Sequence, residues 1–529
     1  MIFSRLLSRF SCALHHRRRL TRLGLVVTML MVQLGCSSLP QPLRPSERQA
    51  PDTAYPAADC PLILQRFAQR IQVSGNADPL GYPIAGYPYL RVDRFLASFS
   101  KQLDSPTRQQ AWYQQLYRLG KKARQVELDN LSPAVTAGAR QQLERCIEQR
   151  ASRDLQADGV FAQLTTRARV PDLYSDWQQA LGLFPLTRQI ILRQIATHQR
   201  RWRQQFNSPA LLQGPSRLYQ PAASKPAADK PLKPEQLAAW LKQARSDSPL
   251  GIPELDSERQ LALFRHFAPL WQSFTRSPAD LIGSPYWRDG APDIDTEDPV
   301  TYLLPSYTRF NGQTLLQLNY LVWFPERPSQ RPLDLYAGPL DGLIWRVTLD
   351  TDGRVLLYDS IHPCGCYHRI FPVAKGLSIK PPSANVEQPL ILPGVAPERE
   401  QGRLVLQLTP EDHYLQGIRI AEERVPRAAA LDNLSDNNSD NNSDNDSTRY
   451  RFDSYHQLRS LATAGGRRNL FDPDGLVGAT ARLERFLLWP MGVASPGAMR
   501  VWGTHAIGFA NRRYFDDPQL FEQFFEPET

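Results

Sequence analysis

The chain lacks the short signatures by which most enzyme classes are recognised. Its 529 residues contain no His-Glu-x-x-His zinc motif, no Gly-x-Ser-x-Gly nucleophile turn, no phosphate-binding Gly-rich loop and no dinucleotide fingerprint. The composition nevertheless indicates a folded chain, since 42% of the residues are hydrophobic and 10% are aromatic. A chain of this length has room for two or more well-buried domains. Function therefore has to be argued from location and from single unusual segments.

Long apolar runs are also missing. The apolar run Leu23–Leu34 has about a dozen residues, whereas a helix that spans a bilayer needs about 20. Acidic residues are absent before Cys36, while six arginines occur there. A basic segment followed by a short apolar run is typical of a secretory signal peptide.

The apolar run ends at Gly35-Cys36, and Ser37 follows. This ending resembles the signal of bacterial lipoproteins, although Gln33 stands at the position where that family prefers leucine. The resemblance implies that residues 1–35 are removed, that Cys36 is acylated, and that its acyl chains hold the protein to the lipid bilayer. Because serine and not aspartate follows the cysteine, the resemblance also favours the outer membrane if the cell is Gram-negative, with the protein facing the periplasm.

The basic character of the chain belongs mostly to this signal. The formal net charge is +9, but six of the positive charges lie before Cys36, which leaves +3 from Cys36 onward. So small a surplus gives no support for a nucleic-acid partner. We therefore expect the bilayer and envelope proteins as partners, and no nucleic acid.

The remaining chain divides into segments of different composition. Residues 36–59 are rich in proline and predict an extended tether. Residues 60–206 show apolar side chains at four-residue spacing and predict a mainly helical domain. Five prolines within residues 207–233 predict a linker. Residues 234–529 predict an α+β domain, so the whole chain is expected to have an α+β fold with a mostly antiparallel sheet and peripheral helices.

The last domain shows both helical and strand patterns. Strands are predicted at residues 315–324, 343–349, 354–360, 403–408 and 414–420, and helices at residues 234–245, 258–274, 478–488 and 518–525. Near residues 432–448, three copies of a four-residue Ser/Asp/Asn repeat lack apolar side chains and predict a disordered insertion. In the helical domain, the Pro- and Gly-rich stretch Gly81–Tyr89 predicts a packed connection between helices.

Cysteines are few, six in all, and five of them remain from Cys36 onward. If Cys36 is acylated, an even number is left, which suits an oxidising compartment. The most economical pairing joins Cys60 to Cys146 within the helical domain and Cys364 to Cys366 locally. The alternative is buried, unpaired thiols.

The segment from His362 to His368 is the most chemically loaded part of the chain. It places His362, Cys364, Cys366 and His368 within seven residues, directly after a predicted strand. Three hypotheses remain open. The thiols form a strained local disulfide that is structural or redox-active. The four side chains bind zinc or copper, although the one-residue spacer departs from the usual zinc knuckle. A thiol is activated by a histidine of the segment, with His505 as a distant partner.

The sequence thus predicts a membrane-anchored lipoprotein of the cell envelope that acts as a binding or assembly factor. A metal or redox site at His362–His368 is part of this hypothesis. The alternative is a periplasmic metal- or thiol-dependent enzyme, a hydrolase or an oxidoreductase, for which no catalytic residue is assigned.

Overall fold

The computed structural model describes residues 60–222, 232–382, 386–397, 402–421 and 447–527. The predicted signal, the tether, the acylated Cys36 and most of the predicted insertion lie outside the described residues. Within the described ranges, no helix is both long enough and apolar enough to cross a bilayer.

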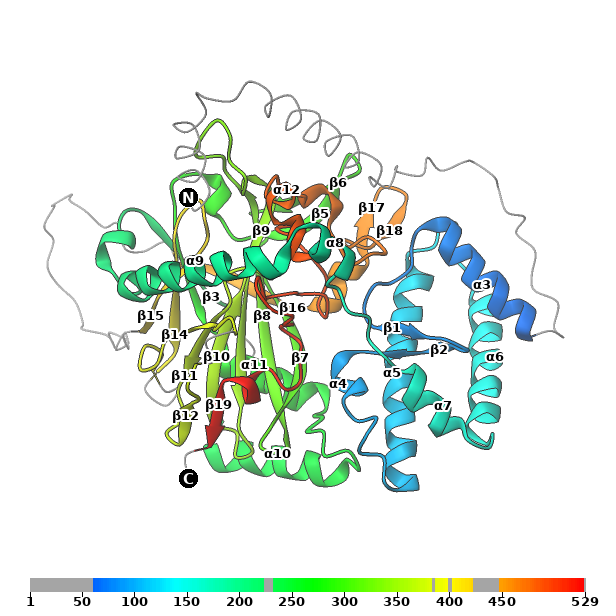
Figure 1. Ribbon diagram of the computed structural model, residues 1–529. Helices are drawn as coiled ribbons and strands as arrows, with labels where there is room; N and C mark the ends of the chain where they lie inside the picture. Colours follow the sequence, from blue (N-terminus) through cyan, green and yellow to red (C-terminus); the bar gives the residue numbers. More distant parts are fainter. Residues whose placement is uncertain (1–59, 223–231, 383–385, 398–401, 422–446, 528–529) are drawn as a thin grey trace, which may run out of the picture. The chain divides into compact units, whose positions relative to one another are not determined.

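The first described part of the chain is mainly helical and appears in blue to cyan in Figure 1. Its principal helices are α3 (Cys60–Ser74), α5 (Pro106–Asp129), α6 (Ala137–Leu155) and α7 (Val160–Arg167). Helix α5 begins as the sequence dictates, because the Ser105 hydroxyl accepts a hydrogen bond from the Arg108 amide and Pro106 occupies the first turn. A disulfide between Cys60 and Cys146 joins α3 to α6, which confirms the predicted pairing.

The Pro- and Gly-rich stretch between α3 and α5 is a β-hairpin. Strand β1 (Tyr82–Ile84) pairs antiparallel with β2 (Tyr87–Val92), which packs on α5. The packing is so close that a Cβ atom at Gly120 of α5 would collide with the carbonyl oxygen of Tyr89. The connection predicted for this stretch is therefore an ordered pair of strands.

An eleven-stranded sheet forms the centre of the remaining structure (Figure 1). Its strands are β3 (Ser216–Pro221), β4 (Leu270–Phe274), β7 (Val300–Phe310), β8 (Gln313–Arg327), β9 (Gly338–Leu349), β10 (Val355–Ile361), β11 (Arg369–Pro372), β13 (Leu390–Ile391), β14 (Leu404–Leu408), β15 (Leu415–Ile420) and β16 (Ser447–Ser454). They lie in the order β13-β11-β10-β9-β8-β7-β16-β3-β4-β14-β15. Six neighbouring pairs are antiparallel and four are parallel. The fold is α+β, as the sequence predicts.

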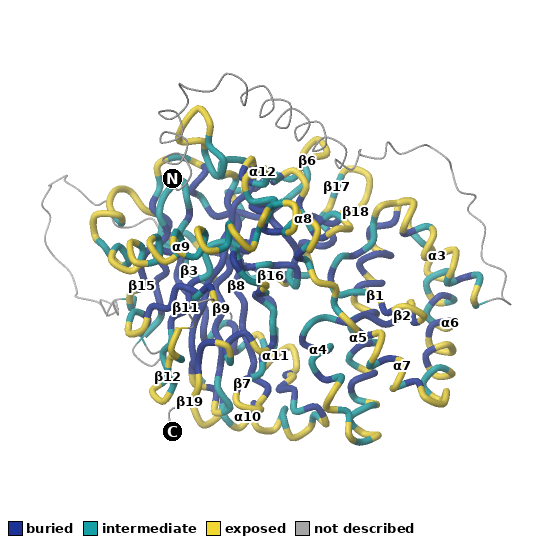
Figure 2. The backbone as a smooth tube through the Cα atoms, viewed as in Figure 1, coloured by how far each residue is buried: buried dark blue, intermediate teal, exposed yellow. Residues whose placement is uncertain are grey.

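Both faces of the sheet are buried, and Figure 2 shows most of its strands in dark blue. Side chains of β8 alternate between two cores. Leu316, Leu318, Tyr320, Val322 and Phe324 belong to the core of the first face, whereas Leu315, Leu321 and Trp323 belong to that of the second face. Helices α10 (Pro234–Asp247) and α11 (Ser257–Phe267) contribute to the first core, and segments between residues 455 and 525 contribute to the second.

The sheet curls until strands from its two ends meet. Arg369 on β11 donates a hydrogen bond from Nη1 to the carbonyl oxygen of Leu415 on β15. Strand β16 connects the two halves of the sheet by two short parallel pairings. Residues 447–450 pair with β3, and residues 451–454 pair with β7.

Four predictions of local structure are wrong in part. The linker predicted over residues 207–233 contains β3, which is stabilised by backbone pairing with β4 and β16. The helix predicted over residues 258–274 ends as α11 at Phe267, because Pro269 cannot continue it, and β4 follows.

The two helices predicted near the C-terminus are also much shorter than expected. Residues 478–488 contain the 3-10 turn η6 (Gly478–Thr480) and the one-turn helix α12 (Arg485–Leu488). Residues 518–525 contain the 3-10 turn η8 (Phe521–Gln523). In the second of these segments, apolar side chains such as Leu520 and Phe521 belong to the second core, so helical spacing there reflects packing and not a long helix.

Candidate functional site

The predicted His362–His368 segment forms a tight loop after β10. The Gly365 amide donates to the His362 carbonyl at 2.8 Å, and the His362 amide donates to the Cys366 carbonyl at 3.0 Å. Gly365 has a φ of 89°, and a Cβ atom there would lie 2.8 Å from the Ala506 carbonyl oxygen. Only glycine fits this position without strain, so the backbone of the loop is held from both sides.

The two histidines of the loop face opposite sides of the sheet. His362 Nδ1 lies 3.1 Å from Asp341 Oδ1 on the first face, whereas His368 Nε2 lies 3.0 Å from Asp359 Oδ2 on the second. The four predicted ligands therefore do not surround one point. In the part of the chain that the structure describes, no group of three or more His, Cys, Asp or Glu side chains is placed to hold a metal ion. The structure thus gives the zinc or copper hypothesis no ligand set.

Cys364 and Cys366 are free thiols, so the predicted local disulfide is absent from the structure. A disulfide across one residue requires a strained ring, and the backbone hydrogen bonds of the loop hold a different turn. A hydrogen bond with Cys364, together with burial, raises the pKa of the Cys366 thiol well above its usual value. A thiol that stays protonated is neither a strong nucleophile nor a thiolate ligand.

His505, the distant partner proposed for a thiol, is buried beside Pro363. Burial lowers the pKa of His505 to about 3, so its imidazole is neutral and a very weak base at neutral pH. It is therefore poorly suited to activate a cysteine.

A buried network that the sequence did not reveal lies on the first face. The Asp341 carboxylate is shared by two imidazoles, since His362 Nδ1 lies 3.1 Å and His413 Nδ1 lies 3.0 Å from its two oxygens. His413 Nε2 lies 3.3 Å from Asp280 Oδ1, and the imidazole stacks on Phe324 with ring centroids 4.0 Å apart. The four ionisable side chains are each 2% exposed or less.

The pKa values of the two imidazoles of this network are shifted in opposite directions. Burial lowers the pKa of His362, and Asp341 offsets that effect only in part, so His362 is neutral at neutral pH. Burial also disfavours charge on His413, but its hydrogen bonds with Asp280 and Asp341 raise its pKa above the usual value. Against the effect of burial, the two imidazoles hold the pKa of Asp341 well below its usual range. The network therefore contains two carboxylates and one imidazole, that of His413, whose protonated form they favour.

Arginines surround the loop, and they differ in their partners. Arg327 pairs with Asp412 at 2.5 Å and donates to the Tyr414 hydroxyl at 3.0 Å. By contrast, Arg369, Arg482 and Arg500 form no ion pair with a carboxylate of the described residues, although each is 4% exposed or less. We call these three the unpaired arginines.

The unpaired arginines bond to main-chain carbonyls. Arg482 Nη2 donates to the Leu340 carbonyl. Arg500 Nη2 donates to the carbonyls of Ala494 and Ser495, at 3.0 Å in both cases. Burial lowers the pKa of Arg369 to about 10, so it keeps its charge at neutral pH. Glu484 interacts with Arg482, but burial raises the pKa of this carboxyl to about 7. The surroundings of the loop thus hold more positive than negative charge.

The half-buried side chains Cys366, Tyr367 and Tyr414 bring this region to the surface, and the two tyrosine rings lie 4.5 Å apart. We call the whole group the polar cluster. Its members are Asp280, Arg327, Asp341, His362, Cys364, Cys366, Tyr367, Arg369, Asp412, His413, Tyr414, Arg482, Glu484 and Arg500.

Sequence reasoning found the loop but not its surroundings, because these come from six separate segments of the chain. One signal was available. Asp341 and Arg346 are charged residues within the otherwise apolar strand β9, and charge in a strand buried on both faces requires a buried partner. Arg346 indeed forms a buried ion pair with Asp359 at 2.5 Å.

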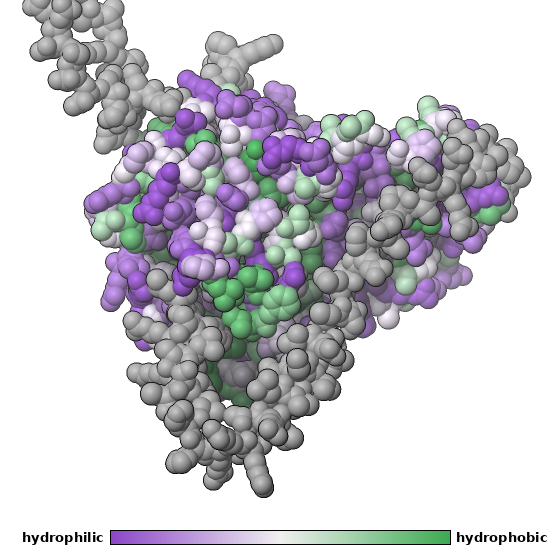
Figure 3. Space-filling model, turned by 90° about the horizontal axis from the view of Figure 1, so that it is seen from above, coloured by the Kyte–Doolittle hydropathy of each residue, from purple (hydrophilic) through white to green (hydrophobic). Residues whose placement is uncertain are grey.

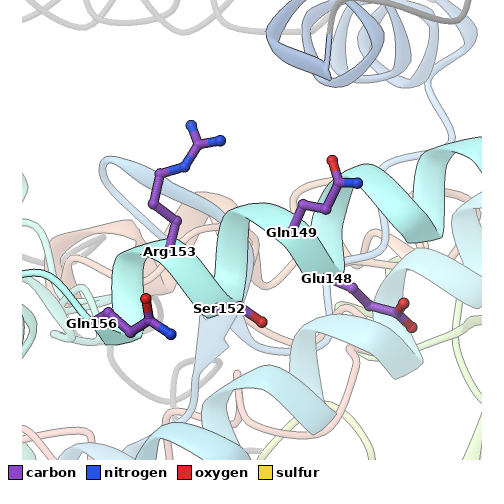
Figure 4. A pocket seen from close by; sticks show the side chains of 5 residues that line it. All are labelled: Glu148, Gln149, Ser152, Arg153 and Gln156. Atoms are coloured by element: carbon purple, nitrogen blue, oxygen red, sulfur yellow. The ribbon is translucent and has the colours of Figure 1, made fainter.

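A shallow depression of about 510 Å³ lies elsewhere, on the exposed side of α6 (Figure 4). It is lined by Glu148, Gln149, Ser152, Arg153 and Gln156, all from this one helix. Side chains from a single helix face do not converge on a ligand from several directions as those of a binding site do. The polar cluster is therefore the stronger candidate.

Comparison of the chain with protein-family models, with curated proteins and with solved structures found no match.

Proposed function

We propose that the protein is a membrane-anchored binding factor of the cell envelope that recognises an anionic ligand at the polar cluster. Anchoring rests on the lipoprotein-like signal that ends at Cys36. Binding rests on one observation, the three unpaired arginines that are buried beside the His362–His368 loop.

A buried cation without a counter-charge lowers the free energy of unfolding, because desolvation is not offset by attraction. Main-chain carbonyls satisfy the hydrogen-bond donors of these arginines but do not neutralise them. Groups with strongly shifted pKa values gather at functional sites for this reason. A guanidinium group suits a carboxylate or a phosphate, so an anion supplies the missing charge.

The enzyme alternative finds support in one other feature. His362 Nε2 is buried and has no hydrogen-bond partner in the described structure, while Asp341 orients the ring through Nδ1. An oriented imidazole with a free nitrogen is the arrangement of a general acid or base. Under this second candidate function, His362→Gln retains ligand binding and abolishes turnover of the ligand.

Thermal unfolding of the full chain in increasing inorganic phosphate tests the binding site. An anion that binds the folded state raises the melting temperature with the logarithm of its concentration. We expect this rise at constant ionic strength, where sodium chloride alone has no such effect. Citrate serves as a second probe for a carboxylate ligand.

Variants locate the effect. Arg482→Met removes a buried cation whose Nη1 atom has no partner among the described residues, and it should abolish most of the rise. Arg451→Met is the matched control, because Arg451 is half-exposed and pairs with Asp298, and it should retain the rise. An equal rise in both variants places the anion elsewhere, and no rise with phosphate or citrate in the wild type contradicts the proposal.

The anchor has its own test. Cys36→Ala should move the protein from the membrane fraction to the soluble fraction, and mass spectrometry of the wild type should show acyl chains on Cys36. A soluble wild-type protein with an unmodified cysteine contradicts this half of the proposal.

A further inference from the structure

Exposed apolar side chains are concentrated in two short segments. Fourteen large hydrophobic residues are exposed in the described ranges, and eight of them lie between residues 177 and 190 or between residues 483 and 487. They are Trp177, Leu181, Leu183, Leu186, Ile190, Leu483, Phe486 and Leu487, with 40 to 71% of each exposed. We call these eight residues the apolar patch.

The two segments belong to one surface. Helix α8 (Asp176–Leu181) packs on the 3-10 turn η7 (Trp489–Met491), which directly follows α12. Gln179 Nε2 donates to the Met491 carbonyl at 2.8 Å, and Gly182 lies so close to Pro490 that a Cβ atom would collide with it. Figure 1 shows α8 and α12 close together, and Figure 3 looks down on this side, where green apolar side chains gather among purple polar ones.

Helix α9 (Phe184–Gln205) extends this surface and is held to the protein by its second half. Trp202 packs against the first core, and Gln199 Nε2 donates to the Gln388 carbonyl at 2.7 Å. The first half carries Leu186 and Ile190, which are 71% and 57% exposed. Helices α8, α9 and α12 each lack a buried residue.

The net charge around the patch is positive. Helix α9 contains five arginines and no aspartate, glutamate or lysine. The acidic side chains of this region, Asp172 and Asp176, share one partner, Arg512, so a single negative charge remains against the five arginines of α9. An apolar surface bordered by arginines faces solvent as a result.

We propose that this surface docks on a lipid bilayer that carries anionic headgroups. Large exposed apolar patches mark contact sites with proteins or membranes. A helix that presents leucine and isoleucine beside several arginines lies in the interface, with its apolar side chains among the acyl chains and its cations at the phosphates. The absence of acidic residues from α9 favours an anionic bilayer as the occupant. The inference uses no residue of the polar cluster, although Leu483 of the patch lies between its members Arg482 and Glu484 in the chain.

Site-specific photo-crosslinking in the full acylated chain, bound to phosphatidylglycerol vesicles, tests the proposal. A photoreactive residue at position 186 should form lipid adducts in about tenfold higher yield than one at position 73. A tenfold preference corresponds roughly to the free energy of transferring one large apolar side chain out of water. Val73 is 81% exposed on α3 and lies outside the patch, so it reports accessibility alone. Yields at position 186 should fall on phosphatidylcholine vesicles and at high salt, because screening weakens the attraction of the arginines.

A second measurement uses substitutions. In the full chain with Cys36→Ala, the pair Leu186→Asp and Ile190→Asp should weaken co-sedimentation with phosphatidylglycerol vesicles about tenfold or more, whereas Val73→Asp should not. Unchanged thermal unfolding shows that the variants fold. Adducts at position 186 with a second copy of the chain, or with another segment of the same chain in place of lipid, overturn the proposal. Equal lipid yields at positions 73 and 186 also overturn it.

Discussion

Two of the clusters of buried charge in the described structure are balanced differently. On the helical side, Asp78 pairs with Arg459, and Glu127 pairs with Arg91 at 2.5 Å. We call these four residues the paired cluster. Each cation there has its own carboxylate, whereas the polar cluster around the His362–His368 loop contains three arginines without one. Both clusters contain buried charge, but only the polar cluster contains buried cations without a paired carboxylate.

The paired cluster has a clear structural purpose. Arg459 follows β16, and its carbonyl oxygen accepts a hydrogen bond from Asn130 Nδ2, directly after α5, at 2.8 Å. The cluster thus joins residues that are more than 300 positions apart in the chain. Buried charge by itself is therefore a poor sign of function, and a surplus of one sign is a better one.

The largest expected effect comes from breaking the paired cluster. Arg459→Met leaves Asp78 buried without its cation and should lower the free energy of unfolding by about 3–5 kcal/mol. Urea denaturation measures this value. Arg451→Met is the control, because its ion pairs are half-exposed and contribute about 1 kcal/mol or less. An equal loss of unfolding free energy in the two variants would show that the buried ion pair contributes no more than the half-exposed ones.

The helical part of the chain contains a disulfide, whereas the cysteines of the polar cluster are free. Cys60→Ser removes the disulfide between α3 and α6, which closes a loop with a sequence separation of 86 residues, and should cost about 2–5 kcal/mol. Cys366→Ser makes the same chemical change at a free thiol and should cost clearly less. Comparison of the two variants by urea denaturation checks this. A larger loss at Cys366 would show that the polar cluster depends on its thiols for stability.

The pH dependence of stability probes the imbalance directly. Burial raises the pKa of Glu484 to about 7 from 4.5, so the folded state favours the protonated carboxyl. This contribution is fully present below pH 4.5 and is lost as the pH rises to about 7, with an upper limit of roughly 3 kcal/mol. Glu484→Gln should therefore gain stability relative to the wild type between pH 5 and pH 7.5. Parallel pH profiles of the two proteins would contradict the assignment.

The smallest effect is expected at an unpaired arginine. Replacement of an uncompensated buried charge by an apolar side chain of similar volume is often neutral or stabilising. Arg482→Met should therefore change the free energy of unfolding by less than about 1 kcal/mol in the absence of phosphate. A loss as large as that of Arg459→Met would mean that the two clusters are balanced alike.

Much of the sheet could be predicted from the sequence, because strand signals are local. The predictions for residues 343–349 and 403–408 correspond to β9 and β14. The turn between β9 and β10 was marked by Gly353, whose φ is 81°. Strand β3 was missed because a six-residue segment that follows one proline and ends in another has no distinctive pattern, and its partners lie about 50 and 230 residues away in the chain. Its pairing is a tertiary effect that overrides local signals.

The candidate site was predicted as a position but not as a set of residues. The loop could be identified from the sequence because two imidazoles and two thiols lie within seven residues. What each group contacts depends on where its side chain points, which the sequence does not give. His362 and His368 are six residues apart but bond to aspartates on opposite faces of the sheet. His413 and Arg482 reach the loop from distant segments, and no spacing rule connects them to it.

Strand β16 has a consequence for the order in which the chain can fold. Its four residues 447–450 pair with β3 and the next four with β7, so the two halves of the sheet become hydrogen-bonded neighbours through this strand alone among the described strands. Until about 450 residues have been synthesised or delivered across a membrane, β3 and β7 have open edges that are prone to mispairing. Contacts of such long range slow folding, since the entropy of closing long loops is lost before the pairing is gained. A chain that ends before residue 447 should therefore lack the backbone pairing that joins the two halves of the sheet, and the last sixth of this protein determines when the sheet becomes continuous.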